Sequence, residues 1–148
     1  MKILVINGPN INMLGIREKD IYGKRDYNEL LKFINDSASL LGVEAKCFQS
    51  NSEGDIVTEI QNAYGVYDGI VINPAAYTHT SIAILDALKA VSIPAVEVHL
   101  SNVNEREAFR RVSYTGMACI KTYAGLGFEG YEKAMETLVD HYKLKNNK

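Results

Sequence analysis

Residues 3 to 10 read Ile3-Leu4-Val5-Ile6-Asn7-Gly8-Pro9-Asn10, so four apolar residues run directly into amides, a glycine and a proline. A short apolar run that ends in turn residues is typical of a buried strand. In an open α/β sheet, ligands bind just beyond the carboxyl ends of the strands, so a site is expected at this loop. The loop lacks both the G-x-G-x-x-G and the G-x-x-x-x-G-K-[ST] spacing, which favours a ligand other than a nucleotide phosphate.

Short apolar runs alternate with amphipathic segments along the chain. Strands are predicted over residues 2–7, 43–50, 69–73, 95–99 and 117–122, and helices over about 25–42, 53–66, 80–91, 104–111 and 128–144. This alternation requires parallel strands joined by right-handed crossovers, with helices on both faces of the sheet. We therefore predict an α/β fold of the flavodoxin-like kind, a three-layer sandwich around a five-stranded parallel sheet of order 2-1-3-4-5.

The length and composition fit a single domain over residues 1–148, with a frayed tail expected from about residue 143. Hydrophobic residues make up 47% of the chain and charged residues 23%, and the net charge is −2, so neither nucleic acid nor an anionic membrane is an expected partner. The apolar run at residues 3–6 is too short for a signal peptide, and no stretch approaches the length of a membrane span. A cytoplasmic location is expected.

The two cysteines are not expected to pair. Cys47 falls in the second predicted strand and Cys119 in the fifth, at opposite edges of the sheet, whereas a disulfide needs Cα atoms within about 7 Å. Both are interpreted as small buried hydrophobic residues in a reducing compartment. With three histidines and no cysteine pair at ligand spacing, no metal site is predicted.

Polar side chains gather at the carboxyl ends of the predicted strands. They are Asn7, Asn10 and Asn12 after the first strand, Asn73, His79, Thr80 and Ser81 after the third, and Glu97, His99 and Ser101 at the fourth. Thr80 or Ser81 is expected to cap the helix that carries Asp86. A rim with many amides and hydroxyls and few carboxylates suits an anionic, polyhydroxylated small molecule whose carboxylate meets backbone N–H groups at a helix start.

Several of these residues also have a purely structural interpretation. Asparagines in the first loop suit left-handed turn conformations, and His79 fits a cap or a surface position. Asp86 and Arg110 are surface residues unless a subunit interface brings them to the site. Arg106 and Arg111 are interpreted as helix-face charges.

His99 is the strongest functional candidate among the polar residues. A polar ring at the end of an apolar strand needs a reason, and histidine exchanges protons near neutral pH. Glu97 lies two residues earlier, on the same face of the strand, where it can orient His99 or form an ion pair with it.

Four sequence blocks, distributed over nearly the whole chain, form one recognisable pattern. They are residues 6–15 with Arg17, Glu18, Tyr22 and Gly23, residues 49–54, residues 72–81, and residues 97–102 with Phe109 and Arg110. Together they resemble the signature of the type II 3-dehydroquinate dehydratases. The resemblance implies a hydro-lyase that reversibly dehydrates 3-dehydroquinate to 3-dehydroshikimate in the shikimate pathway, which serves chorismate and aromatic amino acid biosynthesis, without metal or organic cofactor.

The resemblance also implies roles for individual residues. Tyr22 resembles the general base that removes the proton next to the ketone, and Arg17 the residue that lowers the pKa of this tyrosine. Asn10 resembles the residue that holds a water against the developing enolate, and His99 the acid that protonates the departing hydroxyl. Asn73 with the backbone of Leu100 and Ser101 resembles the carboxylate site, and His79 and Arg110 resemble the contacts to substrate hydroxyls. Members assemble as homododecamers of four trimers, in which Asp86 is implied to reach a neighbouring subunit's site.

Two positions depart from the pattern of that family. Lys19 stands where the family usually has proline, in a loop that is expected to close over the substrate. Ala75 stands where the family usually has glycine. If the backbone there needs a positive φ, Ala75 is strained by roughly 1–2 kcal/mol.

Two other classes of protein share the predicted topology. A phosphate-accepting receiver domain needs acidic residues at the first and third strand ends to hold Mg²⁺, but those ends carry Asn7 and Asn73. An FMN-binding electron carrier needs a hydroxyl-rich phosphate loop after the first strand, where this chain has amides. Both classes are therefore disfavoured.

Overall fold

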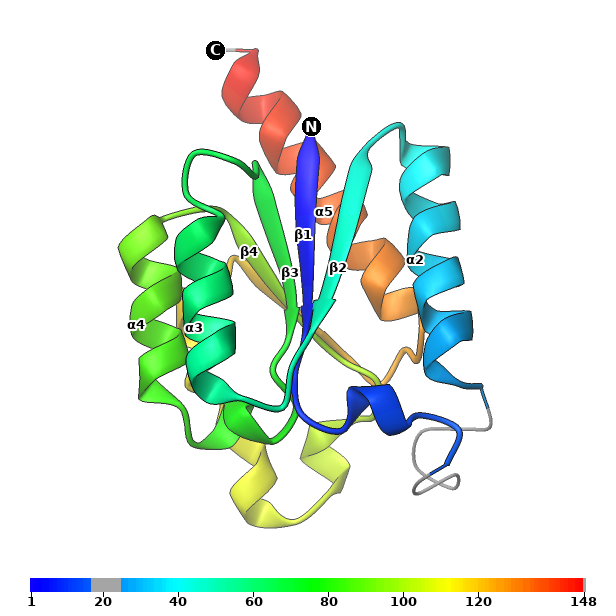
Figure 1. Cartoon of the computed structure of the whole chain (residues 1–148), viewed down its shortest axis with the longest axis vertical. Helices are drawn as coiled ribbons and strands as arrows, with labels where there is room; N and C mark the ends of the chain where they lie inside the picture. Colours follow the sequence, from blue (N-terminus) through cyan, green and yellow to red (C-terminus); the bar gives the residue numbers. More distant parts are fainter. Residues whose placement is uncertain (17–24, 148) are drawn as a thin grey trace.

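A parallel sheet forms the centre of the computed structural model, which describes residues 1–16 and 25–147. Its strands are β1 (Lys2–Asn7), β2 (Glu44–Gln49), β3 (Gly69–Asn73), β4 (Ala95–His99) and β5 (Lys121–Ala124). They pair in the order β2-β1-β3-β4-β5, and every pair is parallel (Figure 1). The predicted fold class and strand order are confirmed.

Helices cover both faces of the sheet because the strand side chains alternate between two apolar clusters. Ile3 and Val5 of β1 pack in one cluster with residues of α2 (Tyr27–Leu41) and α5 (Glu129–Asn146). Leu4 and Ile6 pack in the other with residues of α3 (Glu53–Asn62) and α4 (Ile82–Val91). The result is the predicted sandwich of three layers (Figure 1). None of the helices in the described ranges is long and apolar enough to cross a membrane.

Three helices begin at side chains that accept a hydrogen bond from the backbone of their first turn. Asp26 caps α2, and Ser52 caps α3. The Ser81 Oγ accepts from the Ile84 N–H at 3.0 Å, so Ser81 rather than Thr80 caps α4, the helix of Asp86. Such a cap stabilises a helix by about 1 kcal/mol. These caps fix where each helix starts relative to the strand end that precedes it.

The predictions for the region between β4 and β5 are wrong. The predicted helix over residues 104–111 is two short 3-10 turns, η3 (Val103–Glu105) and η4 (Ala108–Arg111). Eight residues without a buried apolar face do not compensate for the free-energy cost of helix nucleation. The predicted strand over residues 117–122 begins only at Lys121, because η5 (Thr115–Ala118) precedes it and its apolar Met117 is exposed.

The prediction that Cys119 lies in the fifth strand is therefore wrong. Cys119 lies just after η5. Cys47 and Cys119 are both free and partly buried. Burial raises the pKa of the Cys47 thiol to about 11 and, with the charge of Glu97, that of Cys119 to about 12. Both remain unreactive thiols at neutral pH. The tail predicted to fray from residue 143 is helical as far as Asn146.

The loops that follow β1 and β3 approach each other closely at the carboxyl edge of the sheet. The Gly8 N–H donates to the Asn73 carbonyl at 2.8 Å, and a Cβ on Gly8 would lie 2.5 Å from the Pro74 carbonyl oxygen. Only glycine fits there. Ala75 has a φ of 53°, so the strain expected of this departure from the family pattern is present.

Replacing Ala75 with glycine is expected to raise the free energy of unfolding by about 0.5–1 kcal/mol. Glycine relieves a left-handed strain of roughly 1–2 kcal/mol, but it gains more entropy in the unfolded chain. Urea unfolding measures the change. Ala76→Gly is the matched control, since Ala76 is not among the residues with positive φ, and it is expected to lower stability. An equal loss for both variants would contradict the assignment of strain to Ala75.

Candidate active site

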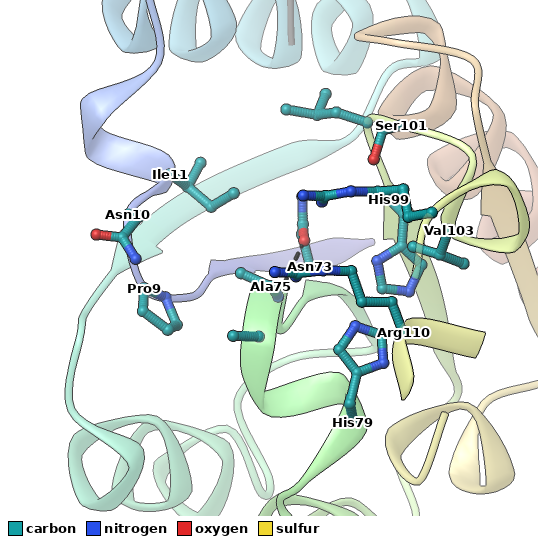
Figure 2. A pocket seen from close by; sticks show the side chains of 13 residues that line it. Pro9, Asn10, Ile11, Asn73, Ala75, His79, His99, Ser101, Val103 and Arg110 are labelled. Carbon is teal, nitrogen blue, oxygen red and sulfur yellow. Dashed lines mark hydrogen bonds between the residues drawn. The ribbon is translucent and has the colours of Figure 1, made fainter. Parts of the chain in front are cut away.

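A pocket opens at the carboxyl edge of the sheet, where the loops after β1, β3 and β4 meet (Figure 2). The residues that line it are Pro9, Asn10, Ile11, Asn73, Ala75, Ala76, His79, His99, Leu100, Ser101, Val103, Arg106 and Arg110. All of the binding and catalytic residues singled out from the sequence are among them, except Glu97, Asp86, Arg17 and Tyr22. Residues that follow three different strands are thus brought to one cavity.

The four exceptions have different explanations. Glu97 lies behind the pocket and reaches it through His99. Asp86 is exposed on α4 and does not line the pocket of its own chain. Arg17 and Tyr22, the predicted partner and general base, fall outside the described residues. The roles of Arg17 and Tyr22 stay predictions, as does the contribution of Asp86 to the site of a neighbouring subunit.

His99 ends β4 with its ring almost fully buried. Its Nε2 lies 2.8 Å from Oε1 of Glu97, as the expected pairing of residues i and i+2 on one strand face requires. An ionised carboxylate only accepts hydrogen bonds, so Nε2 carries a hydrogen and donates. Nδ1 is then the ring atom left to exchange a proton with a ligand. In Figure 2 the ring lies beside Val103 and Arg110, at the wall of the pocket.

Glu97 is completely buried and is surrounded by hydroxyl donors. Its Oε1 accepts from Ser113 at 2.9 Å and Thr115 at 3.0 Å, and its Oε2 accepts from Thr122 at 3.0 Å. Burial alone raises the pKa of Glu97, but the hydrogen bonds and charge of His99 and the hydroxyl bonds outweigh it and hold the pKa below its ordinary value. Glu97 is therefore a fixed anion that orients the His99 ring.

Replacing Glu97 with glutamine is expected to lower the free energy of unfolding by about 1–3 kcal/mol at pH 7. One carboxylate oxygen becomes an NH2 group that cannot accept, so the buried donors on that side lose their acceptor. The folded-state pKa of Glu97 is depressed, so its stabilising contribution is complete above the ordinary value of 4.5 and is lost as the pH falls through the folded-state pKa. The difference in free energy of unfolding between the variant and the wild type should therefore shrink as the pH falls below 4.5 and through the folded-state pKa of Glu97.

Urea unfolding at steps between pH 7 and pH 3 measures this difference. Glu44→Gln is the control, because the side chain of Glu44 is 77% exposed and lies 3.9 Å from Lys2. It should change stability by well under 1 kcal/mol at any pH. A Glu97→Gln loss that stayed constant down to pH 3 would show that the carboxylate charge is not what stabilises the fold there.

The cationic side of the pocket comes from the segment that contains the turns η3 and η4. Arg110 lies on η4, with its Nε 2.7 Å from Glu107 Oε2. Arg106 lines the same pocket with a side chain only 14% exposed. The interpretation of Arg106 as a helix-face charge is therefore wrong, because helical spacing does not apply to a segment of two 3-10 turns. Arg111 is exposed and does not line this pocket.

His79 and Asn10 occupy the opposite walls of the pocket (Figure 2). The Nδ1 of His79 lies 2.7 Å from the Val112 carbonyl oxygen, which can only accept, so Nδ1 donates and Nε2 is left for a ligand. Asn10 adopts the left-handed conformation, with a φ of 69°. The structural interpretation of this asparagine as a turn residue and its position in the pocket are therefore compatible.

Sequence reasoning missed several residues that support the site. Ser113, Thr115 and Thr122 bind Glu97, and Tyr131 binds Asn7 and Asn73. Their sequence gives no sign of this, since each meets its partner only through the fold. Within the described ranges, no group of three or more His, Cys, Asp or Glu side chains could hold a metal ion.

Comparison with known proteins gives consistent matches. A family model described as "Dehydroquinase class II" matches residues 1–139. The 3-dehydroquinate dehydratase of Clostridium perfringens (strain 13 / Type A) is 58% identical over 146 residues, which are 98% of this chain and 100% of the relative. That of Fusobacterium nucleatum subsp. nucleatum is 55% identical over 145 residues, with coverages of 96% and 99%.

Solved structures agree with these sequence matches. The type II dehydroquinase from Butyrivibrio crossotus superposes with a TM-score of 0.91 at 55% identity, over 93% of this chain and 97% of that one. The type II dehydroquinase from Propionibacterium acnes gives a TM-score of 0.89 at 41% identity, over 93% and 94%. The similarity thus extends over nearly the whole of both chains.

Proposed function

This chain belongs to the class II dehydroquinase family, and from that premise we propose that it is a hydro-lyase that reversibly dehydrates 3-dehydroquinate to 3-dehydroshikimate in the shikimate pathway. The reaction removes a proton from the carbon next to the ketone and a hydroxyl from the following carbon, with loss of water. The observation that carries the proposal is the buried Glu97–His99 pair at the wall of a pocket with two arginines.

His99 is the proposed acid for the departing hydroxyl. Hydroxide is a poor leaving group, so a positioned proton donor accelerates its departure by about 10²–10⁴-fold. Because Nε2 is bound to Glu97, Nδ1 of the doubly protonated ring is the atom that delivers the proton. Glu97 stays anionic and balances the charge of the ring before the transfer.

The first half of the reaction needs a base and a stabiliser for the enolate. Tyr22 is the proposed base, with Arg17 beside it to favour the phenolate. Asn10 is proposed to hold a water against the enolate oxygen, where a preorganised donor is worth most. The position of Asn10 in the pocket supports this last role.

Substrate binding is assigned to the remaining residues of the pocket. We propose that Asn73 with the backbone of Leu100 and Ser101 holds the carboxylate, and that His79 and Arg110 contact hydroxyl groups. Arg106, which sequence reasoning did not include, adds positive charge for an anionic substrate. No organic cofactor or metal has a step in this scheme.

The assembly and location of the protein belong to the same proposal. We expect a homododecamer of four trimers, in which Asp86 completes the site of a neighbouring subunit, and a cytoplasmic location. The exposure of Asp86 on α4, outside its own chain's pocket, is consistent with this use. The proposal predicts that dissociated subunits have incomplete sites.

Addition of 3-dehydroquinate to the purified protein tests the function. Ultraviolet absorbance of the conjugated enone product should rise, and a chelator should not slow the rise. Borohydride added with substrate should leave no covalent adduct, since an enolate mechanism forms no imine with a lysine. Absence of the enone signal, its loss with a chelator, or an adduct by mass spectrometry would contradict the proposal.

A further inference from the structure

The hydroxyl of Tyr131 joins the carboxyl ends of β1 and β3 inside the molecule. Tyr131 is on α5 and is fully buried, yet its hydroxyl lies 2.6 Å from Asn7 Oδ1 and 3.0 Å from Asn73 Nδ2. Asn73 Oδ1 in turn accepts from the Ala75 N–H at 3.2 Å. Asn73 and Ala75 line the pocket, whereas Tyr131 does not.

The directions of these hydrogen bonds follow from one fixed donor. The Ala75 backbone N–H can only donate, so the Asn73 atom facing it must be the oxygen. The amide nitrogen of Asn73 then faces Tyr131 and donates to it, and the single phenolic proton is left for Asn7 Oδ1. One N–H of Asn73 is used in this way; the amide carries a second N–H, and Asn73 lines the pocket.

Burial stabilises the protonated form of Tyr131, on which this arrangement of hydrogen bonds depends. Desolvation raises the pKa of Tyr131, so the residue stays a phenol whose O–H donates to Asn7 Oδ1. A buried hydroxyl without partners would cost several kcal/mol, and a phenylalanine would fill the same apolar space without that cost. The hydroxyl therefore has a use other than packing.

We propose that Tyr131 is a positioning residue for substrate binding: through its hydroxyl it fixes the Asn73 amide so that the second N–H meets the substrate carboxylate. The inference rests on the proposed function of the pocket. Without the hydroxyl, the Asn73 amide can rotate, and the loop that begins at Ala75 loses one of its fixed contacts. Binding is then weakened while the proton-transfer groups are untouched.

A double-mutant cycle with 3-dehydroquinate tests the proposal on the whole protein. Tyr131→Phe is expected to raise KM about five- to tenfold and to change kcat by less than about twofold, because a binding contact is lost equally in ground and transition states. On an Asn73→Ala background, the same substitution should leave KM within about twofold. The loss of melting temperature should be smaller on the Asn73→Ala background, where the hydrogen bond between the two residues is already absent.

Tyr123→Phe is the matched control. It removes a tyrosine hydroxyl that lies 2.7 Å from Thr137 Oγ1 of α5, away from the pocket, and KM should not change. If Tyr131→Phe does not fold, Asn7→Ala takes its place, since it removes the acceptor of the phenolic proton, and the same rise in KM and the same loss of effect without Asn73 are expected.

The outcomes separate this inference from the function on which it rests. An unchanged KM in Tyr131→Phe, or an equal rise in KM with and without Asn73, would overturn the positioning role while leaving the dehydration intact. A wild-type protein that does not convert 3-dehydroquinate would overturn the proposed function, and the inference with it.

Discussion

Replacement of His99 by alanine is expected to lower kcat for dehydration by about 10²–10⁴-fold, with KM changed far less. His99 is the proposed proton donor to the departing hydroxyl, and the variant lacks it. The fold should survive, although Glu97 loses one of its hydrogen-bond donors. Steady-state kinetics followed by enone absorbance measures the effect, with circular dichroism as the check on folding.

His141→Ala is the control for this substitution. His141 is on α5 and lines a different hollow, near Pro94 and Lys145, so its replacement should leave kcat unchanged. A His99→Ala enzyme with ordinary turnover would contradict the acid role, and so would an equal loss in His141→Ala.

Replacement of Arg17 by alanine is expected to lower kcat by roughly 10²–10³-fold and to move its rise with pH towards higher pH. A tyrosine has an ordinary pKa near 10, so only about one in a thousand is a phenolate at pH 7. One arginine about 4 Å away supplies up to roughly 4 kcal/mol at an effective dielectric near 20, or about three pKa units at most. The kcat of wild type and variant between pH 5 and pH 10 measures the shift.

Arg25→Ala is the matched control for the loss of one positive charge near this part of the chain. Arg25 stacks on Phe128, with its guanidinium carbon 3.9 Å from the ring centroid, and it does not line the pocket. Its pH profile should match that of the wild type. An Arg17→Ala enzyme with near-normal kcat and an unshifted profile would show that Tyr22 gets its acidity elsewhere.

The central part of the fold could be predicted from sequence because its strands carry an unambiguous signal. β3 and β4 are continuous buried runs with bounds as predicted, and β1 runs into its loop at Asn7 as predicted. The strain at Ala75 was expected only if the backbone there had a positive φ, on the basis of the family resemblance, and the observed φ of 53° meets that condition. In these places local sequence and global structure agree.

The segment between β4 and β5 could not be predicted in the same way. Its 3-10 turns are too short to show a helical periodicity in the sequence. The apolar Met117 and Ile120 suggested a strand, although both are exposed and precede β5. The error hid Arg106, whose position in the pocket depends on those turns. Tyr131 was hidden for another reason, since it lies 124 residues from Asn7 along the chain.

The most direct test of the account follows the proton next to the ketone of 3-dehydroquinate by NMR in D₂O. We predict that His99→Ala exchanges this proton for deuterium without dehydrating the substrate, because Tyr22 still forms the enolate while no acid releases the hydroxyl. Tyr22→Phe should do neither. Loss of exchange in His99→Ala as complete as its loss of dehydration, or continued exchange in Tyr22→Phe, would contradict the division of roles between Tyr22 and His99.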